Sequence, residues 1–193
     1  REIIPPGGED LPALLYLQGG PGFPAPRPLA PTGLIGKALE RYRVILMDQR
    51  GTGRSHRIDA LSPAAERTAE HLALLRQDNI VRDAERLREH LGLEKWSLFG
   101  QSFGGFCITA YLSQAPERVE HAFFTGGIPT LKGADELYRA TFSKLKARQQ
   151  RFYREFPWAQ GRIEEIISHL DNSDECLPTG ERLSSLRFRT IGI

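Results

Sequence analysis

Short apolar runs alternate with amphipathic stretches along the first 129 residues. The runs lie at 13–17, 43–48, 96–100 and 118–127. Continuous apolar runs of this length are typical of strands that are buried on both faces of a sheet. Helix-type patterns separate them at 34–42, at 77–92 and from Ser102 through Gln114. This alternation predicts an α/β fold with a mostly parallel sheet and helices on both of its faces.

The clearest helix pattern is the one at 77–92. Its apolar stripe comprises Ile80, Ala84, Leu87 and Leu91. Asp78 or Asn79 is the candidate N-cap, and Gly92 is the expected stop. We therefore expect a helix that packs one face on the sheet and leaves its charged residues in solvent.

The pattern changes after about Pro129. Residues 134–156 form a long amphipathic helix pattern, and further helices are expected around 163–170 and 181–190. None of these residues forms a convincing strand pattern. The sequence thus predicts two parts, 1–129 and 130–193, of which the second is a helical insertion or subdomain.

Charge and cysteine content argue against several classes of protein, including nucleic-acid-binding, membrane-binding and disulfide-stabilised proteins. The formal net charge of +2 gives no electrostatic reason to expect nucleic acid or an anionic membrane as the partner. No apolar run approaches the ~20 residues of a membrane span. Cys107 and Cys176 provide no disulfide framework. We expect reduced thiols and a cytoplasmic location, although the start at Arg1 gives no information on targeting.

Residues 100–104 form a motif that carries chemistry. Gly100, Gln101, Ser102, Phe103 and Gly104 match Gly-x-Ser-x-Gly, with a strand pattern before and a helix pattern after it. Such a turn exposes a serine Oγ at the edge of the sheet, and the two glycines relieve its crowding. The alternative is a tight strand-to-helix turn that uses small residues for packing alone. The flanking elements favour a nucleophile.

An acyl-transfer serine also needs backbone donors for the oxyanion. The N–H of Phe103, directly after the serine, is the expected first donor. The second is expected from residues 18–22, QGGPG, where Gly19 and Gly20 follow the first strand. An ordinary turn is the alternative interpretation of this loop.

Three segments together carry a family resemblance. LQGGPGF, MDQRGTGRS and GQSFGGF, in this order and spacing, resemble the proline iminopeptidase (prolyl aminopeptidase) family of α/β-hydrolases. The resemblance covers residues 11 to about 129. It implies an incomplete α/β-hydrolase fold, with 1–129 as the N-terminal part of the core and 130–193 as part of a helical cap. It implies neither a metal nor an organic cofactor.

The resemblance also implies roles for single residues. Ser102 is the nucleophile, Gly19, Gly20 and Phe103 form the oxyanion hole, and Gly100 and Gly104 shape the elbow. Asp48 and Arg50 match the Asp-Gln-Arg-Gly segment of the family and are expected to order the loop beside the site; a surface ion pair is the alternative. Gln18 departs from the family, which usually has histidine there.

The residues that would activate the serine are not identifiable in the sequence. Serine needs a general base and an orienting acid, which in this fold follow it in the chain. His121 and His169 are the histidines after Ser102, one in a strand and one in a helix pattern, and Asp171 and Asp174 follow a helix. We expect the chain to be part of a longer protein, truncated at both ends and lacking the upstream edge strands of the sheet.

The expected activity is release of an N-terminal residue, typically proline, from a small peptide through an acyl-enzyme on Ser102. Family members hold the substrate's free amino group with acidic residues, some of them in the cap. Glu164, Glu165 and Glu175 are such positions, although surface carboxylates are the simpler interpretation. Two alternatives remain: an esterase or amidase on the same fold, and a non-catalytic binding protein. The oligomeric state is open.

Overall fold

The computed structural model describes residues 1–191 of the chain. The chain divides into two compact units, Arg1–Pro129 and Thr130–Ile193. Each unit is described by itself. Among the described residues, no helix combines the length and the apolar composition that crossing a bilayer requires.

The first unit is built on a five-stranded sheet. Its strands are β1 (Glu2–Ile3), β2 (Ala13–Leu17), β3 (Arg43–Leu46), β4 (Trp96–Gln101) and β5 (Val119–Thr125). Their order across the sheet is β1-β3-β2-β4-β5, and β2 to β5 pair in parallel. The predicted mostly parallel sheet is therefore confirmed. The short β1 pairs antiparallel with β3, so the expectation that no upstream edge strand is present is wrong at residues 2–3.

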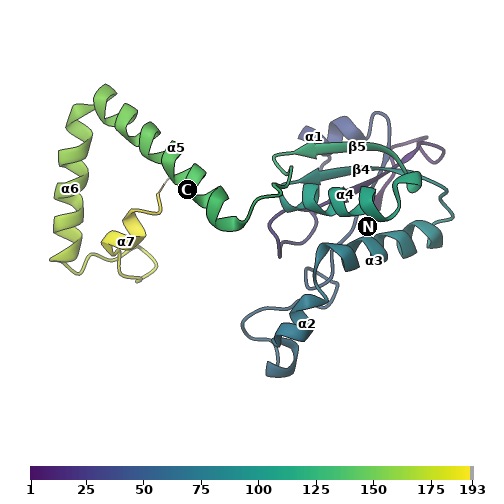
Figure 1. Cartoon of the computed structure of the whole chain (residues 1–193), viewed down its shortest axis with the longest axis horizontal. Helices are drawn as coiled ribbons and strands as arrows, with labels where there is room; N and C mark the ends of the chain where they lie inside the picture. Colours follow the sequence, from purple (N-terminus) through teal and green to yellow (C-terminus); the bar gives the residue numbers. More distant parts are fainter. Residues whose placement is uncertain (192–193) are drawn as a thin grey trace. The chain divides into compact units, whose positions relative to one another are not determined.

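Helices cover both faces of this sheet, as predicted (Figure 1). On one face, α3 (Gln77–His90) and α4 (Phe103–Gln114) pack against β2 and β4. On the other face, α1 (Gly33–Ala38) contributes Ile35 to a smaller cluster around Tyr16 and Phe99. The remaining short elements are α2 (Ala69–Ala73) and the 3-10 helices η1 (Ala64–Glu66) and η2 (Pro116–Arg118).

A buried polar cluster joins α3, α4 and β4. The indole N–H of Trp96 donates to the hydroxyl of Tyr111 at 2.9 Å, and that hydroxyl donates to Glu85. Glu85 also accepts two hydrogen bonds from the guanidinium of Arg88, at 2.9 and 2.8 Å. Burial and the Glu85 carboxylate both raise the pKa of Tyr111. The hydroxyl therefore stays protonated and connects the two helices.

The predicted N-cap of α3, Asp78 or Asn79, is wrong. The helix begins at Gln77, with Arg76 at the N-cap position and no side-chain cap, so Asp78 and Asn79 already lie in its first turn. The expected stop is confirmed, because Gly92 has φ +66°. Arg88, which lies outside the predicted apolar stripe, is only 4% exposed.

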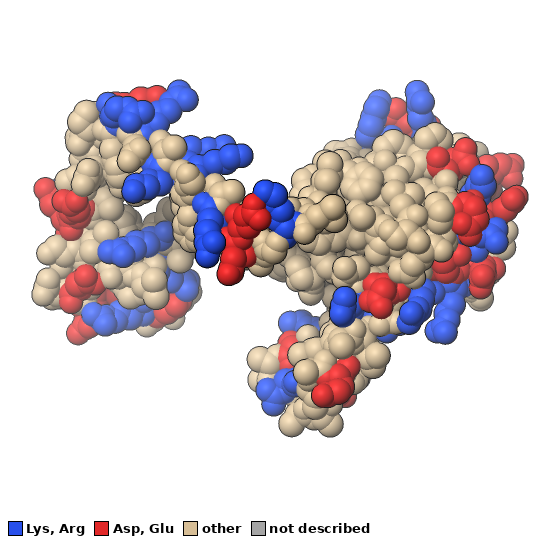
Figure 2. Space-filling model, viewed as in Figure 1, with Lys and Arg blue, Asp and Glu red and all other residues tan. Residues whose placement is uncertain are grey.

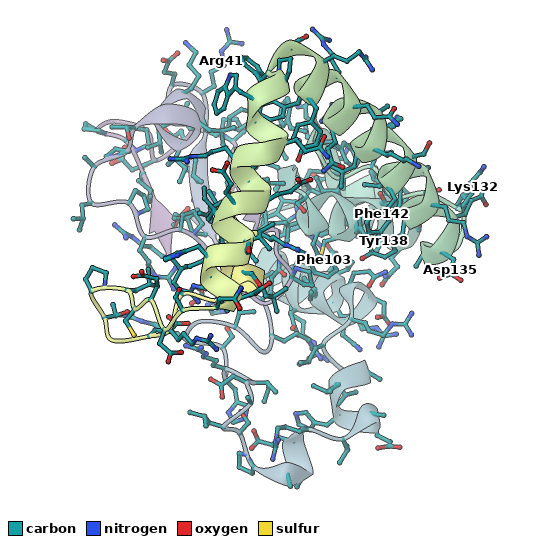
Figure 3. All side chains as sticks on the ribbon, turned by 90° about the vertical axis from the view of Figure 1, so that its left-hand side faces the viewer. Arg41, Phe103, Lys132, Asp135, Tyr138 and Phe142 are labelled. Carbon is teal, nitrogen blue, oxygen red and sulfur yellow. The ribbon has the colours of Figure 1, made fainter. Side chains whose placement is uncertain are left out.

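The described part of the second unit, residues 130–191, contains three helices. They are α5 (Ala134–Glu155), α6 (Pro157–Asp171) and α7 (Ser185–Phe188). Tyr138 and Phe142 lie one turn apart on α5, and both are 62% exposed (Figure 3). Lys and Arg side chains are distributed along the same helix (Figure 2). Among the described residues, α5 therefore exposes both apolar and basic side chains.

Candidate active site

The strand register brings three loops to one edge of the sheet. Leu17, near the end of β2, lies opposite Gly100 of β4, and Tyr16 lies opposite Leu46 at the end of β3. The segments that follow these strands, at 18–22, at 48–53 and at Ser102, therefore leave the sheet side by side. The carboxyl edge of a parallel sheet is where ligands bind in open α/β folds.

Ser102 occupies a strained turn between β4 and α4. Its backbone has φ +52° and ψ −117°, a conformation that residues with a side chain rarely adopt. Two hydrogen bonds hold the turn. The N–H of Ser102 donates to Thr125 O at 2.8 Å, and the N–H of Gly105 donates to Ser102 O at 2.9 Å. The turn is thus anchored both to β5 and to its own helix.

Glycine is required at both flanking positions of the motif. A Cβ at Gly100 would overlap the carbonyl of Gly104, and a Cβ at Gly104 would overlap the carbonyl of Leu17. The second contact packs the start of α4 directly on β2. The motif therefore reflects two backbone-to-backbone approaches that a side chain would block.

A third glycine contact was not anticipated from the sequence. A Cβ at Gly127 would overlap Ser102 O, and a Cβ at Gly105 would overlap the carbonyl of Gly127. The segment after β5 therefore packs against the elbow from the side. The signal in the sequence is the Gly126-Gly127 pair at the end of an apolar run.

The loop after β2 lies against the serine. A Cβ placed on Gly19 would come within 2.9 Å of Ser102 Cβ and would overlap Gln101 O. Phe103 is the first residue of α4, so its N–H has no acceptor within the helix. Within residues 1–191, the N–H groups of Gly19, Gly20 and Phe103 donate to no protein acceptor. The geometry thus brings the sequence-predicted donor loop and the serine together.

Asp48 organises the loop region beside this edge. Its carboxylate accepts from the N–H of Ala25 and from the N–H of Arg54, each at 2.9 Å, and pairs with Arg27. Burial acts to raise the pKa of Asp48, but these three partners together outweigh it and hold the pKa below its ordinary value. Asp48 therefore stays charged and connects residue 25 to residue 54.

Gln49 and Arg50 extend this network. The side chain of Gln49 is 3% exposed and donates to Gln18 O at 3.0 Å. Arg50 binds Asp83 of α3 through two hydrogen bonds of 2.7 Å and donates to Leu74 O at 2.8 Å. Asp48 and Arg50 thus do not pair with each other; each connects the loop to a different segment.

Three histidines, His56, His121 and His169, have partners other than Ser102. His121 sits near the start of β5, where its Nδ1 is 3.5 Å from Ser97 Oγ, whereas Ser102 follows the end of β4. His56 and His169 lie 3.0 Å from Glu66 and Glu175, respectively. No side chain within residues 1–129 forms a hydrogen bond with Ser102 Oγ. The same part of the chain holds no cluster of His, Cys, Asp and Glu suited to a metal ion.

The comparison with protein families is decisive for the fold. Residues 12–189 match the family described as alpha/beta hydrolase fold. The chain belongs to the alpha/beta hydrolase fold family. The solved structure of Rv0554 from Mycobacterium tuberculosis is similar to this chain in fold, with a TM-score of 0.50 and 20% identity. It covers 77% of this chain, and the chain covers 46% of it.

Two curated proteins are similar to almost the whole of this chain. The chain is 46% identical over 192 residues to a proline iminopeptidase of Aeromonas sobria, covering 96% of this chain and 45% of the relative. It is 35% identical to a proline iminopeptidase of Aspergillus aculeatus, over 95% of this chain and 43% of the relative. The resemblance seen in the three motifs is thereby confirmed. The chain spans less than half the length of these relatives.

Proposed function

We propose that this chain carries the nucleophile and the oxyanion hole of a serine aminopeptidase that releases N-terminal proline from peptides. The observation that carries the proposal is the backbone of Ser102, held at φ +52° between β4 and α4 with the Gly19 loop packed against it. A strained, glycine-packed turn that exposes a hydroxyl is expected where the strain serves catalysis.

The proposed reaction proceeds in two stages. Ser102 Oγ attacks the carbonyl carbon of the N-terminal proline, and its proton passes to a general base. The N–H groups of Phe103 and of the Gly19-Gly20 loop donate to the oxygen that becomes negative. The C–N bond then breaks, the departing amine takes the proton, and water hydrolyses the prolyl ester to free proline and Ser102.

The base and its orienting acid are assigned to a segment that follows the described residues. In alpha/beta hydrolases these residues come after the serine in chain order. Within residues 1–129, the histidine that follows Ser102 is His121, which lies near the start of β5 and not at the carboxyl edge of the sheet. The greater length of the proline iminopeptidase relatives supports this assignment.

The surrounding residues have supporting roles in this proposal. Asp48 and Arg50 order the loop beside the oxyanion hole, which their bonds to Ala25, Arg54 and Asp83 support. Residues 1–129 act as the hydrolase core and 130–193 as part of a cap. The substrate is a small peptide with a free N-terminus, as the names of the relatives suggest. Two free cysteines fit a reducing, cytoplasmic location.

The test uses the protein at its full natural length and three substrates: a prolyl-arylamide, its N-acetylated form and a short acyl ester. We expect hydrolysis of the free prolyl-arylamide and little of the blocked form. Ser102→Ala should reduce hydrolysis of the free prolyl-arylamide by at least about a thousandfold. Preferred hydrolysis of the ester would instead support the esterase alternative. Absence of all hydrolysis would support a binding protein.

A further inference from the structure

A separate pocket opens beside the elbow, within the unit Arg1–Pro129. It has a volume of about 350 Å³, in the range of small-ligand sites. Its wall includes Pro21 and Gly22 of the oxyanion loop, Phe103 directly after the candidate nucleophile, and the loop after β3. Phe103, the first residue of α4, is labelled in Figure 3. The pocket therefore lies beside the proposed site of acyl transfer and shares the oxyanion loop and Phe103 with it.

The lining of this pocket is mainly apolar. Ile58, Leu72, Leu75, Ile80 and Phe103 come to it from four different segments. Leu72 is 43% exposed in spite of its apolar side chain. Apolar groups that converge on an open cavity gain free energy when a ligand covers them.

Three polar side chains of the lining, those of Gln49, Arg50 and Thr52, are already engaged in hydrogen bonds. Gln49 donates to Gln18 O, and the hydroxyl of Thr52 donates to Gln49 O at 2.7 Å. Arg50 is bound by Asp83 and Leu74 O. The inner wall thus offers no unpaired side-chain donor from these three residues, and an apolar group suits it best.

The charge at the rim selects which part of a substrate can enter. No Asp or Glu lines the pocket. Asp83 neutralises Arg50, and Asp78 acts on the same guanidinium. Arg76 is exposed at the rim and forms no ion pair within residues 1–191. The uncompensated charge of the rim is therefore positive.

We propose that this pocket binds the first residue of the departing peptide, with an apolar side chain inside and, in a dipeptide, its carboxylate beside Arg76. The inference rests on the proposed function. The acyl part of an aminopeptidase substrate carries a cationic amino group, which a positive rim disfavours. The departing residue of a dipeptide carries a carboxylate, which the rim attracts.

The charge part of the proposal is tested with Arg76→Ala in the full-length protein. We expect kcat/KM for the dipeptide Pro-Leu to fall roughly three- to tenfold, with little change for Pro-Leu-amide. Arg76→Lys should retain most of the activity on the dipeptide. Arg86→Ala, which changes an exposed arginine of α3 outside the pocket, is the matched control. An equal loss for both substrates, or no loss, would overturn this part.

The apolar part is tested with two neighbouring leucines. Leu72 lines the pocket, whereas Leu74, 51% exposed, does not. In Leu72→Ala we expect the preference for Pro-Leu over Pro-Gly to fall about fivefold, with the deacylation rate unchanged, because the departing group has left by then. Leu74→Ala should keep the preference. Equal preferences in both variants would contradict the assignment of the pocket.

Failure of the two proposals can be told apart. Wild-type protein that releases no proline from any of these peptides would overturn the proposed function. Wild-type protein that releases proline, with unchanged discrimination in the Arg76 and Leu72 variants, would overturn the pocket assignment alone. Circular dichroism and thermal melts establish that each variant is folded.

Discussion

At the scale of single residues, the backbone conformation of Ser102 is strained and lowers the stability of the fold. Its φ of +52° favours glycine, and the contacts of Gly19, Gly100, Gly104 and Gly127 hold it in that conformation. Backbone strain of this kind costs about 1–3 kcal/mol. The molecule keeps a serine at a position where glycine would be more stable, which is understandable if the hydroxyl is used.

The strain predicts an unusual result of substitution. Ser102→Gly should be more stable than Ser102→Ala by about 1 kcal/mol, because both variants lack the hydroxyl and only glycine relieves the positive φ. Urea unfolding at neutral pH measures the difference. An alanine variant as stable as the glycine variant would show that the turn is not strained.

Asp48 makes a second prediction at this scale. Asp48→Asn should lower the free energy of unfolding at pH 7 by roughly 1–3 kcal/mol, because the amide cannot accept all three hydrogen bonds. The pKa of Asp48 is lowered in the folded state, so its stabilisation is present above pH 3.8 and is lost as the pH falls through the folded pKa.

The difference between wild type and Asp48→Asn should therefore be larger at pH 7 than near pH 3, as measured by urea unfolding at both values. Asp10→Asn changes an exposed carboxylate and is the control. A difference that stays constant with pH would contradict the charged role of Asp48.

At the scale of elements, the close approach of α4 to β2 depends on Gly104. Gly104→Ala should destabilise the protein by more than about 3 kcal/mol, because its Cβ would overlap the carbonyl of Leu17. Gly161 lies inside α6 with open space around it. Gly161→Ala should stabilise its helix by about 0.5–1 kcal/mol. Thermal melts of both variants test this prediction. A shift of the melting temperature in the same direction in both variants would contradict it.

The sequence predicts the elements more completely than their contacts. The alternation of apolar runs identifies β2 to β5, α3 and α4, because buried parallel strands and amphipathic helices have distinct periods. It misses β1, because a pair of residues carries no period. The buried Arg88 and the pairing of Arg50 with Asp83 depend on long-range packing, which no local pattern encodes.

Only part of the candidate site can likewise be predicted from the sequence. The Gly-x-Ser-x-Gly motif identifies Ser102 and its two flanking glycines, because the tight turn requires glycine at both flanking positions. The contact of Gly127 with Ser102 O and the pocket beside Phe103 join segments that are distant in sequence. Those features become visible only when the strand register is known.

At the scale of the whole chain, apolar surface is exposed in both units. Phe123 and Phe124 of the edge strand β5 are 41% and 37% exposed, and Tyr138 and Phe142 of α5 are 62% exposed. An edge strand with exposed aromatic residues is a template for pairing with another chain. We expect the 193-residue polypeptide, expressed alone, to self-associate at micromolar concentrations.

Size-exclusion chromatography with light scattering measures this association. Phe124→Lys should reduce it, because a charge on the edge strand opposes pairing. Leu61→Lys, at an isolated residue that is 94% exposed, should leave it unchanged. A monomeric wild-type polypeptide would contradict the prediction.

The central claim is that Ser102 is the nucleophile, and a covalent label tests it most directly. The full-length protein is treated with a fluorophosphonate, with and without a proline-terminated peptide, and the adduct is located by peptide mass spectrometry. We expect one adduct, on Ser102, that the peptide suppresses and that Ser102→Ala lacks. An adduct on another residue, or proline release that persists in Ser102→Ala, would contradict it.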